Sequence, residues 1–293
     1  MAIWVGRDGE ITQPRTGQEM RPWLPGRGEL DLPGEIDRRT ALVDWLIAPE
    51  NPFLAKVEVN RIWSHLMGRG LVDPIDDFRN SNPPSNPQLL NALANDFLEN
   101  GYDRKQLINT ILKSRVYQLD SAATDQNRRD RKYFSHYPVR RLSAEQVVDA
   151  ITRLTAVQQT YEGLPGQILV TQLPGPDLGN EFMRMLGKPA RNTACECERS
   201  NAPDLAQALE LASGEFIDRS VRAPDNCFRT AQVAGRSIEE IVEDIHWGAL
   251  SRPPNHQEHA AIAAHFEGAA SEEEGLEDLL WAIINSKEFL FQH

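Results

Sequence analysis

Apolar residues recur at helical spacing through the segment from Asn51 to Leu71. They are Phe53, Leu54, Val57, Ile62, Leu66 and Met67. Pro52 suits the first turn of a helix, where its missing N–H is not needed. Gly68 and Gly70 are typical of the end of a helix. The pattern therefore predicts a helix across this segment, stopped by the glycine pair.

The same helical spacing recurs along most of the chain. The predicted starts are Asp37, Asn86, Asp103, Ser143, Asp204, Ser237 and Ser271, with a further helix after Pro253-Pro254. Several of these starts carry capping chemistry, such as Ser143-Ala-Glu-Gln146 and Ser237-Ile-Glu-Glu240. Helices joined by short loops bury their apolar faces against one another. We therefore predict a mostly α fold, as a single compact multi-helix domain.

Two stretches interrupt this pattern. Residues 1–36 are rich in Pro and Gly, which favours an extended arm packed on the domain that residues 37–293 form. Residues 162–203 form a long irregular insertion, in which only Ile168–Leu173 has the composition of a strand. Long ordered loops are commonly functional, so this insertion is one place where a site is expected.

Charge is distributed unevenly along the 293 residues, whose formal net charge is −12. Residues 1–140 carry 19 acidic and 19 basic side chains, whereas residues 141–293 carry 24 acidic and 12 basic ones. Such an acidic surface repels nucleic acid and anionic membranes, so we expect neither as a partner. No apolar run approaches the roughly 18 residues of a membrane span, and the first residues lack the pattern of a signal peptide.

Polar groups lie within the otherwise apolar 51–71 helix, and they need partners if they are buried. Candidate binding residues are Asn60, Arg61, Trp63 and His65 there, with Arg140 and Arg141 further along; candidate catalytic carboxylates are Asp76, Asp77 and Glu145. Two carboxylates with arginines could perform acid–base chemistry on a sugar. The same set could form a buried ion network, which is the favoured interpretation, and we expect Arg61 to be largely buried in it.

Cysteines provide the remaining candidate chemistry. Cys195 and Cys197 would project to one side of an extended segment, but two thiolates do not complete the four-coordinate shell of a structural zinc. Cys195, Cys197 and Cys227 are the candidate metal ligands. No further pair of Cys or His residues lies nearby at the spacing of a zinc finger. We predict no bound metal, no cofactor and a structural role for the thiols; metal binding, or a disulfide to Cys227, remains an alternative.

The ordered motifs between Arg38 and His293 carry a resemblance to a known family. They include Asn60-Arg61-x-Trp63, Gly68-x-Gly70-Leu71, Arg140-Arg141-Leu-x-Ala-Glu145, Cys195-Glu-Cys-Glu198-Arg199-Ser200 and Leu250-Ser-Arg-Pro-Pro254. The chain resembles the uncharacterised C-terminal domain of large exported proteins of planctomycete-type bacteria. The resemblance implies a multidomain parent, often with a cytochrome-c-like domain near its N-terminus, and often discussed alongside polysaccharide breakdown. Asn86 departs from the pattern, where histidine is expected.

The resemblance brings context and no defined activity. The candidate binding residues also include Glu198 and Arg199, within the cysteine motif. The leading hypothesis is a helical C-terminal module of an exported protein that binds or positions a glycan-type substrate or a partner domain. One alternative is a glycan-active enzyme that uses the Asp/Glu/Arg set, and another is a thiol or metal module. Whether the chain is an enzyme is left open by its sequence.

Overall fold

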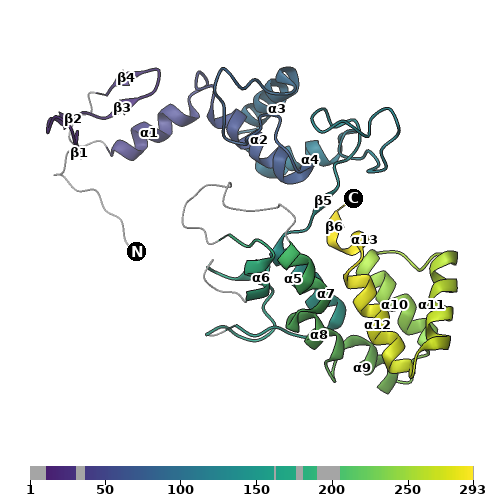
Figure 1. Cartoon of the computed structure of the whole chain (residues 1–293). Coiled ribbons are helices and arrows are strands. Elements are labelled where there is room, and N and C mark those ends of the chain that lie inside the picture. Colours follow the sequence, from purple (N-terminus) through teal and green to yellow (C-terminus); the bar gives the residue numbers. More distant parts are fainter. Residues whose placement is uncertain (1–10, 31–36, 162, 176–180, 190–204, 293) are drawn as a thin grey trace. The chain divides into compact units, whose positions relative to one another are not determined.

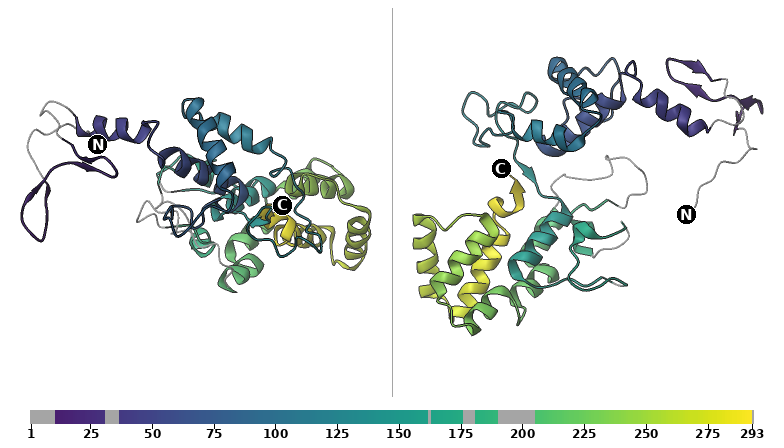
Figure 2. Two further views of the ribbon diagram at one scale, coloured as in Figure 1. Left: turned by 90° about the horizontal axis from the view of Figure 1, so that it is seen from above. Right: turned by 180° about the vertical axis from the view of Figure 1, so that it is seen from behind.

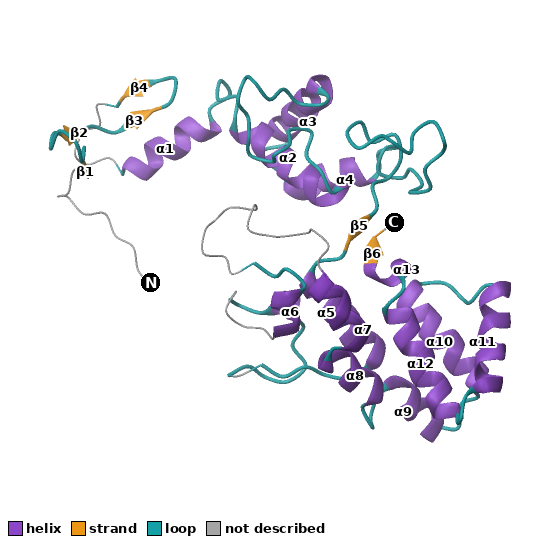
Figure 3. Cartoon of the chain, viewed as in Figure 1, coloured by secondary structure: helices purple, strands orange, loops and turns teal. Residues whose placement is uncertain are grey.

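The computed structural model describes residues 11–30, 37–161, 163–175, 181–189 and 205–292. Helices dominate this part of the chain, which confirms the mostly α fold (Figures 1 and 3). The backbone contacts divide the chain into two compact units, Met1–Pro138 and Val139–His293. The sequence pattern predicts one multi-helix domain and does not mark this division. Each unit has its own cluster of buried apolar side chains, which is the physical reason for the division. The boundary of the arm at residue 36 stays a prediction.

The N-terminal unit begins with two small hairpins, followed by four helices. The elements are β1 (Ile11–Thr12), β2 (Glu19–Met20), β3 (Trp23–Leu24), β4 (Gly28–Glu29), α1 (Arg38–Ile47), α2 (Leu54–Met67), α3 (Pro87–Glu99) and α4 (Arg104–Leu112). Strand β1 pairs with β2, and β3 pairs with β4, both antiparallel. The hairpins and α1 bury little: among their described residues only Leu24 is buried.

Local capping sets the ends of these helices as the sequence predicts. Asn86 accepts a hydrogen bond from the backbone N–H of Leu89 at 3.0 Å, and Asp103 accepts one from Lys105 at 2.8 Å. Gly68 closes α2 in the left-handed conformation, with φ of 73°. The core between α2, α3 and α4 consists of Val59, Trp63, Met67, Leu93, Phe97, Leu107 and Ile111, with their neighbours.

The C-terminal unit consists of short helices around a larger core. Its elements are β5 (Arg140–Arg141), α5 (Ala144–Thr155), a 3-10 helix η1 (Val170–Gln172), α6 (Glu181–Met185), α7 (Leu205–Ser213), α8 (Glu215–Arg222), α9 (Cys227–Val233), α10 (Ile238–Leu250), α11 (His256–Gly268), α12 (Glu272–Ile284), α13 (Lys287–Leu290) and β6 (Phe291–Gln292). Strands β5 and β6 pair antiparallel and so join the two ends of the unit. Helices α10 and α12 lie side by side in the views of Figures 1 and 2.

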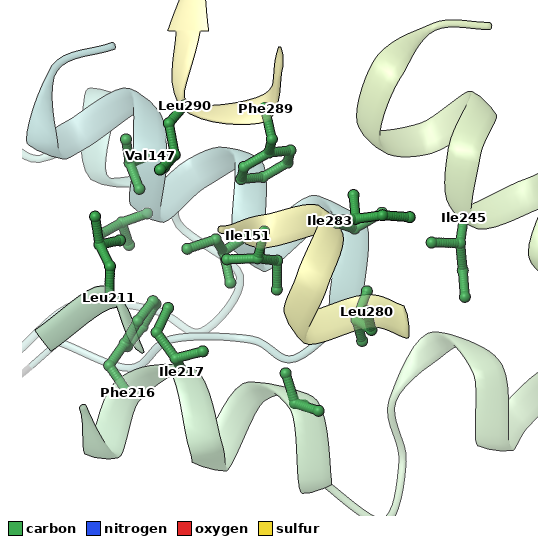
Figure 4. Packing of buried hydrophobic residues seen from close by; sticks show 14 of the residues in the cluster. Val147, Ile151, Leu211, Phe216, Ile217, Ile245, Leu280, Ile283, Phe289 and Leu290 are labelled. Carbon is green, nitrogen blue, oxygen red and sulfur yellow. The ribbon is translucent and has the colours of Figure 1, made fainter. Parts of the chain in front are cut away.

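The core of this unit gathers side chains from helices that are far apart in the sequence. Figure 4 shows Ile151 of α5 next to the α12 helix that carries Leu280 and Ile283, with Phe289 of α13 above it and Val147 of α5 near Leu290. The hydrophobic effect over these buried surfaces is the main stabilising contribution to the unit. The closing strand β6 follows α13 directly, so the packing of α13 also positions the β5–β6 pair.

Two local expectations are wrong, each for a short-range reason. The helix predicted from Asp204 onwards is divided at Gly214 into α7 and α8. A Cβ added at Gly214 would lie 2.3 Å from the Glu210 carbonyl oxygen, so this turn requires glycine. The strand predicted near Val170 is a 3-10 helix instead. Asp149 determines this, because its carboxylate accepts the backbone N–H groups of Val170 at 2.6 Å and Thr171 at 3.1 Å.

Arginines connect helix ends across the C-terminal unit. Arg252, in the Leu250-to-Pro254 motif, bonds Glu288 at the start of α13 and Glu258 in the first turn of α11, with its shortest contact to each at 2.7 Å. The Arg252 guanidinium lowers the pKa of Glu258 to about 2. Arg229 donates to the Ala223 carbonyl at 3.0 Å and pairs with Glu273 on α12. The motif arginine is thus an architectural residue.

None of the described helices combines the length and apolar composition that a bilayer-spanning helix requires.

Substitution of Leu280 tests the C-terminal core. Leu280 is 0% exposed, so Leu280→Ala should lower the free energy of unfolding by about 2–5 kcal/mol through lost burial and a residual cavity. Leu205 is 74% exposed, so Leu205→Ala is the matched control, with an expected change within about 0.5 kcal/mol. Chemical denaturation of both variants measures the difference. Equal losses would contradict this description of the core.

Candidate functional site

Asn60 is the most completely bonded of the predicted site residues. Its side chain is 0% exposed in the middle of α2. The Nδ2 group donates to the carbonyl oxygens of Val72 at 2.9 Å and Ile75 at 2.7 Å. Its Oδ1 accepts the backbone N–H of Val72 at 2.9 Å. Both ends of the amide are therefore used to hold the chain that follows α2.

The glycine after α2 is required by this arrangement. A Cβ added at Gly70 would lie 2.2 Å from the Val72 carbonyl oxygen and 2.9 Å from Nδ2 of Asn60. Since no side chain fits at these separations, the Gly68-x-Gly70 motif combines a left-handed helix end with a close backbone approach. Ser85 extends the arrangement, because its backbone N–H donates to the Leu71 carbonyl at 2.7 Å. The Asn60 and Gly68-x-Gly70 motifs thus fold one loop onto α2.

Arg61 has the expected type of partner but not the expected burial. Its guanidinium forms a two-pronged pair with the Asp76 carboxylate, with Nε–Oδ1 and Nη2–Oδ2 distances of 2.9 Å. The side chains are 42% and 41% exposed, so the expectation of a largely buried arginine is wrong. Arg61 follows the buried Asn60 on α2. Because consecutive helical residues point in different directions around the axis, Arg61 faces the solvent-exposed loop that carries Asp76.

Asp77 is paired with a residue that we did not select from the sequence. Arg79 holds its carboxylate through two contacts of 2.6 Å, and hydrogen bonding to Arg79 lowers the pKa of Asp77. A general acid must carry a proton near the working pH. This arginine therefore works against Asp77 as a proton donor. The short Asp77-Phe-Arg79 spacing was the available sequence signal for the pair.

Trp63 and His65 differ in exposure although they are close in sequence. Trp63 is 1% exposed and meets Phe134 edge-on, with ring centroids 5.4 Å apart. Its indole is part of the N-terminal core, since it packs among the buried residues of α2, α3 and α4. His65 is exposed on the last turn of α2. The two residues therefore do not share one site.

Arg140, Arg141 and Glu145 belong to the C-terminal unit. Arg140 Nε donates to the Gln292 side-chain oxygen at 2.8 Å and so supports the β5–β6 pair. Arg141 donates to Gln207 and to the Leu186 carbonyl, and its burial lowers its pKa. Glu145 is half-buried in the first turn of α5. Through these hydrogen bonds both arginines brace the C-terminal unit.

The thiol candidates are only partly described. Cys195, Cys197, Glu198 and Arg199 lie outside the described residues. Cys227 is the first residue of α9 and is a free thiol. Burial raises the pKa of the Cys227 thiol to about 11. Since the thiolate is the nucleophile and the metal ligand, this environment disfavours both roles near neutral pH. Among the described residues no group of three or more His, Cys, Asp and Glu is placed to hold a metal ion.

An ordered loop of the N-terminal unit, residues 124–135, presents basic side chains and a tyrosine to solvent. Asp130 accepts the backbone N–H groups of Lys132 and Tyr133 at 2.8 Å and of Ser135 at 2.9 Å. Asn127 donates to the Ser135 carbonyl at 3.0 Å. Tyr133 is 68% exposed, and the Lys132 Nζ lies 5.6 Å from the centre of its ring. We call this segment the Tyr133 loop.

A pocket of about 350 Å³ lies among α5, α9 and α10 of the C-terminal unit. Its lining residues are Arg153, Leu154, Cys227, Phe228, Ala231, Ile241, Asp244, Ile245 and Gly248. Small-molecule sites commonly range from about 300 to 1,000 Å³, so this pocket is at the lower end. Sequence reasoning missed it, because most of these residues occupy positions that fit a helix core. Gly248, in the interior of a helix, was the one available signal.

Comparison with known proteins gives a family and no activity. The model of a family described as protein of unknown function (DUF1553), also called PSD1, matches residues 38–266, which is more than half of the chain. Searches of the curated proteins and of the solved structures found no match.

The adjacent residues Asn60 and Arg61 provide a matched test of the α2 motif. Asn60→Ala leaves buried backbone groups of Val72 and Ile75 without partners, so it should cost at least about 3 kcal/mol of unfolding free energy. Arg61→Ala breaks a half-exposed pair and should cost less than about 1 kcal/mol. Urea denaturation of both variants measures the costs. A larger loss for Arg61→Ala would refute this assignment.

Proposed function

The chain belongs to the DUF1553 family of proteins of unknown function, and we propose that it is a non-catalytic module that binds a glycan. In this proposal the module is part of an exported, multidomain bacterial protein of planctomycete type. The parent would carry further domains, such as a cytochrome-c-like one, and the module would hold a polysaccharide for them. The motif resemblance supports this wider context, and the described residues support the binding role.

The main support for a non-catalytic role is that the candidate carboxylates Asp76 and Asp77 are each paired with an arginine. Hydrolysis of a glycosidic bond requires one carboxylic acid that donates a proton and a second carboxylate that acts as base or nucleophile. Asp76 is held by Arg61 in a two-pronged pair, and Asp77 by Arg79 with a lowered pKa. The charged form of Asp77 is therefore stabilised, and both oxygens of Asp76 are occupied by the Arg61 guanidinium. This favours an architectural role for the loop and a binding role for the module.

The Tyr133 loop supplies a surface of the right chemistry for an acidic polysaccharide. Tyrosine rings present an apolar face and a polar tip, which makes them frequent contact residues at interfaces. Residues 124–135 contain four basic and two acidic side chains, so the surroundings of Tyr133 are net positive. The hydrogen bonds of Asp130 hold this loop in one conformation, which reduces the entropy lost when a ligand binds. We therefore assign the sulfated or uronic-acid class of glycan to this surface.

Affinity electrophoresis in gels that contain alginate, carrageenan or neutral dextran tests the proposal. The protein should be retarded by at least one of the two anionic polysaccharides, more weakly as salt is raised, because exposed charges are screened. Tyr133→Ala should weaken the retardation about fivefold, the scale of one aromatic contact. Trp23→Ala removes another exposed ring, 59% accessible, from the same unit and should have no effect.

The same samples distinguish binding from catalysis. After long incubation the recovered polysaccharide should keep its original chain length. Shortened or unsaturated products would show a glycan-active enzyme. Migration that no polysaccharide alters, or retardation by dextran alone, would contradict the assignment of an acidic glycan to the Tyr133 loop.

A further inference from the structure

We propose that the pocket among α5, α9 and α10 binds a small amphipathic carboxylate, with a compact apolar body and one anionic head group. This inference concerns the C-terminal unit and is independent of the Tyr133 loop in the N-terminal unit. It is carried by the shape of the pocket, the composition of its walls and the charge at its edge.

The walls of the pocket suit an apolar body. Leu154 comes from α5, Phe228 and Ala231 from α9, and Ile241 and Ile245 from α10. Transfer of apolar surface from water to such walls is favourable at about 25 cal/mol per Å². A space of about 350 Å³ accepts a chain of several carbons or a single substituted ring, but not an oligosaccharide.

The edge of the pocket carries one arginine, Arg153, that no ion pair within the described residues engages. Arg153 and Asp244 are its only charged lining residues, and both are exposed. Asp244 is paired with Arg236, which lies on the turn before α10 and does not line the pocket. Arg153 follows Thr152 on α5, and no ion pair within the described residues neutralises it. A carboxylate is the planar anion that a guanidinium binds best.

The thiol of Cys227 completes the apolar wall rather than adding a reactive group. Its burial keeps it protonated near neutral pH, so it contributes a small, polarizable, uncharged surface. A neutral thiol also leaves the electrostatic preference of the pocket to Arg153. The site therefore favours binding an anion without a covalent bond to sulfur.

Gly248 keeps the pocket open on the α10 side. A Cβ added there would lie 3.4 Å from Leu154 Cδ1, an ordinary contact, so alanine fits at this position. A longer side chain would extend from the helix into the space that Gly248 now lines. Glycine in a helix interior costs about 1 kcal/mol relative to alanine, and an open pocket is a reason for its presence.

Three probes with one chain length test the head group: octanoate, octanol and octylamine. Isothermal titration of the whole chain should show octanoate binding at least about tenfold more tightly than the other two, the scale of a hydrogen bond to a charged group. Arg153→Gln should weaken the binding of octanoate by about the same factor and leave the affinity for octanol unchanged. Arg219→Gln, which removes an exposed arginine outside the pocket, is the matched control.

A steric variant tests the location. Gly248→Leu should abolish binding of octanoate and octanol alike, while Gly248→Ala should retain it; circular dichroism checks that both variants are folded. Equal affinity for octanoate and octylamine, no binding of any probe, or octanoate binding that survives Gly248→Leu in a folded protein would each overturn the proposal.

Discussion

The side-chain amide of Asn60 holds the N-terminal unit together at the end of its central helix. Its hydrogen bonds to Val72 and Ile75 fold the following loop back onto α2. This folding requires Gly70, because any Cβ there would collide with the Val72 carbonyl. It also brings Asp76 to Arg61 on the next position of the helix. One buried amide thus fixes the loop whose carboxylates first suggested catalysis.

Similar arrangements recur through the chain, each with a polar side chain that satisfies backbone groups or helix ends. Asp149 holds η1, Asp130 shapes the Tyr133 loop, and Arg252 joins α10 to α11 and α13. Buried or paired groups of this kind fix a unique conformation. These polar motifs therefore account for architecture, whereas the exposed Tyr133 loop and the α5–α9–α10 pocket are surfaces of the described residues that can meet a ligand.

The sequence predicted what depends on local chemistry. Helix starts at Asn86, Asp103 and Ser143 follow from capping, which involves neighbours within three residues. It failed where the deciding contact is specific to the folded backbone. The sequence pattern continues the helix through Gly214, and only the folded backbone shows the Glu210 carbonyl oxygen too close to this position for a side chain. The pocket was not predictable either, since apolar residues that line a space and those that fill a core have the same periodicity.

The loop that follows α2 depends most on the buried side-chain amide of Asn60. Amide hydrogen exchange of the Val72 N–H, measured by NMR in the wild type and in Asn60→Ala, tests this directly. Loss of the side-chain amide should accelerate exchange at Val72 about 100-fold or more. This factor corresponds to the expected cost of about 3 kcal/mol, because about 1.4 kcal/mol is a factor of ten. The amide of Leu107, in the α4 core, should change less if the effect is local. Exchange at Val72 that is unchanged by the substitution would contradict the account.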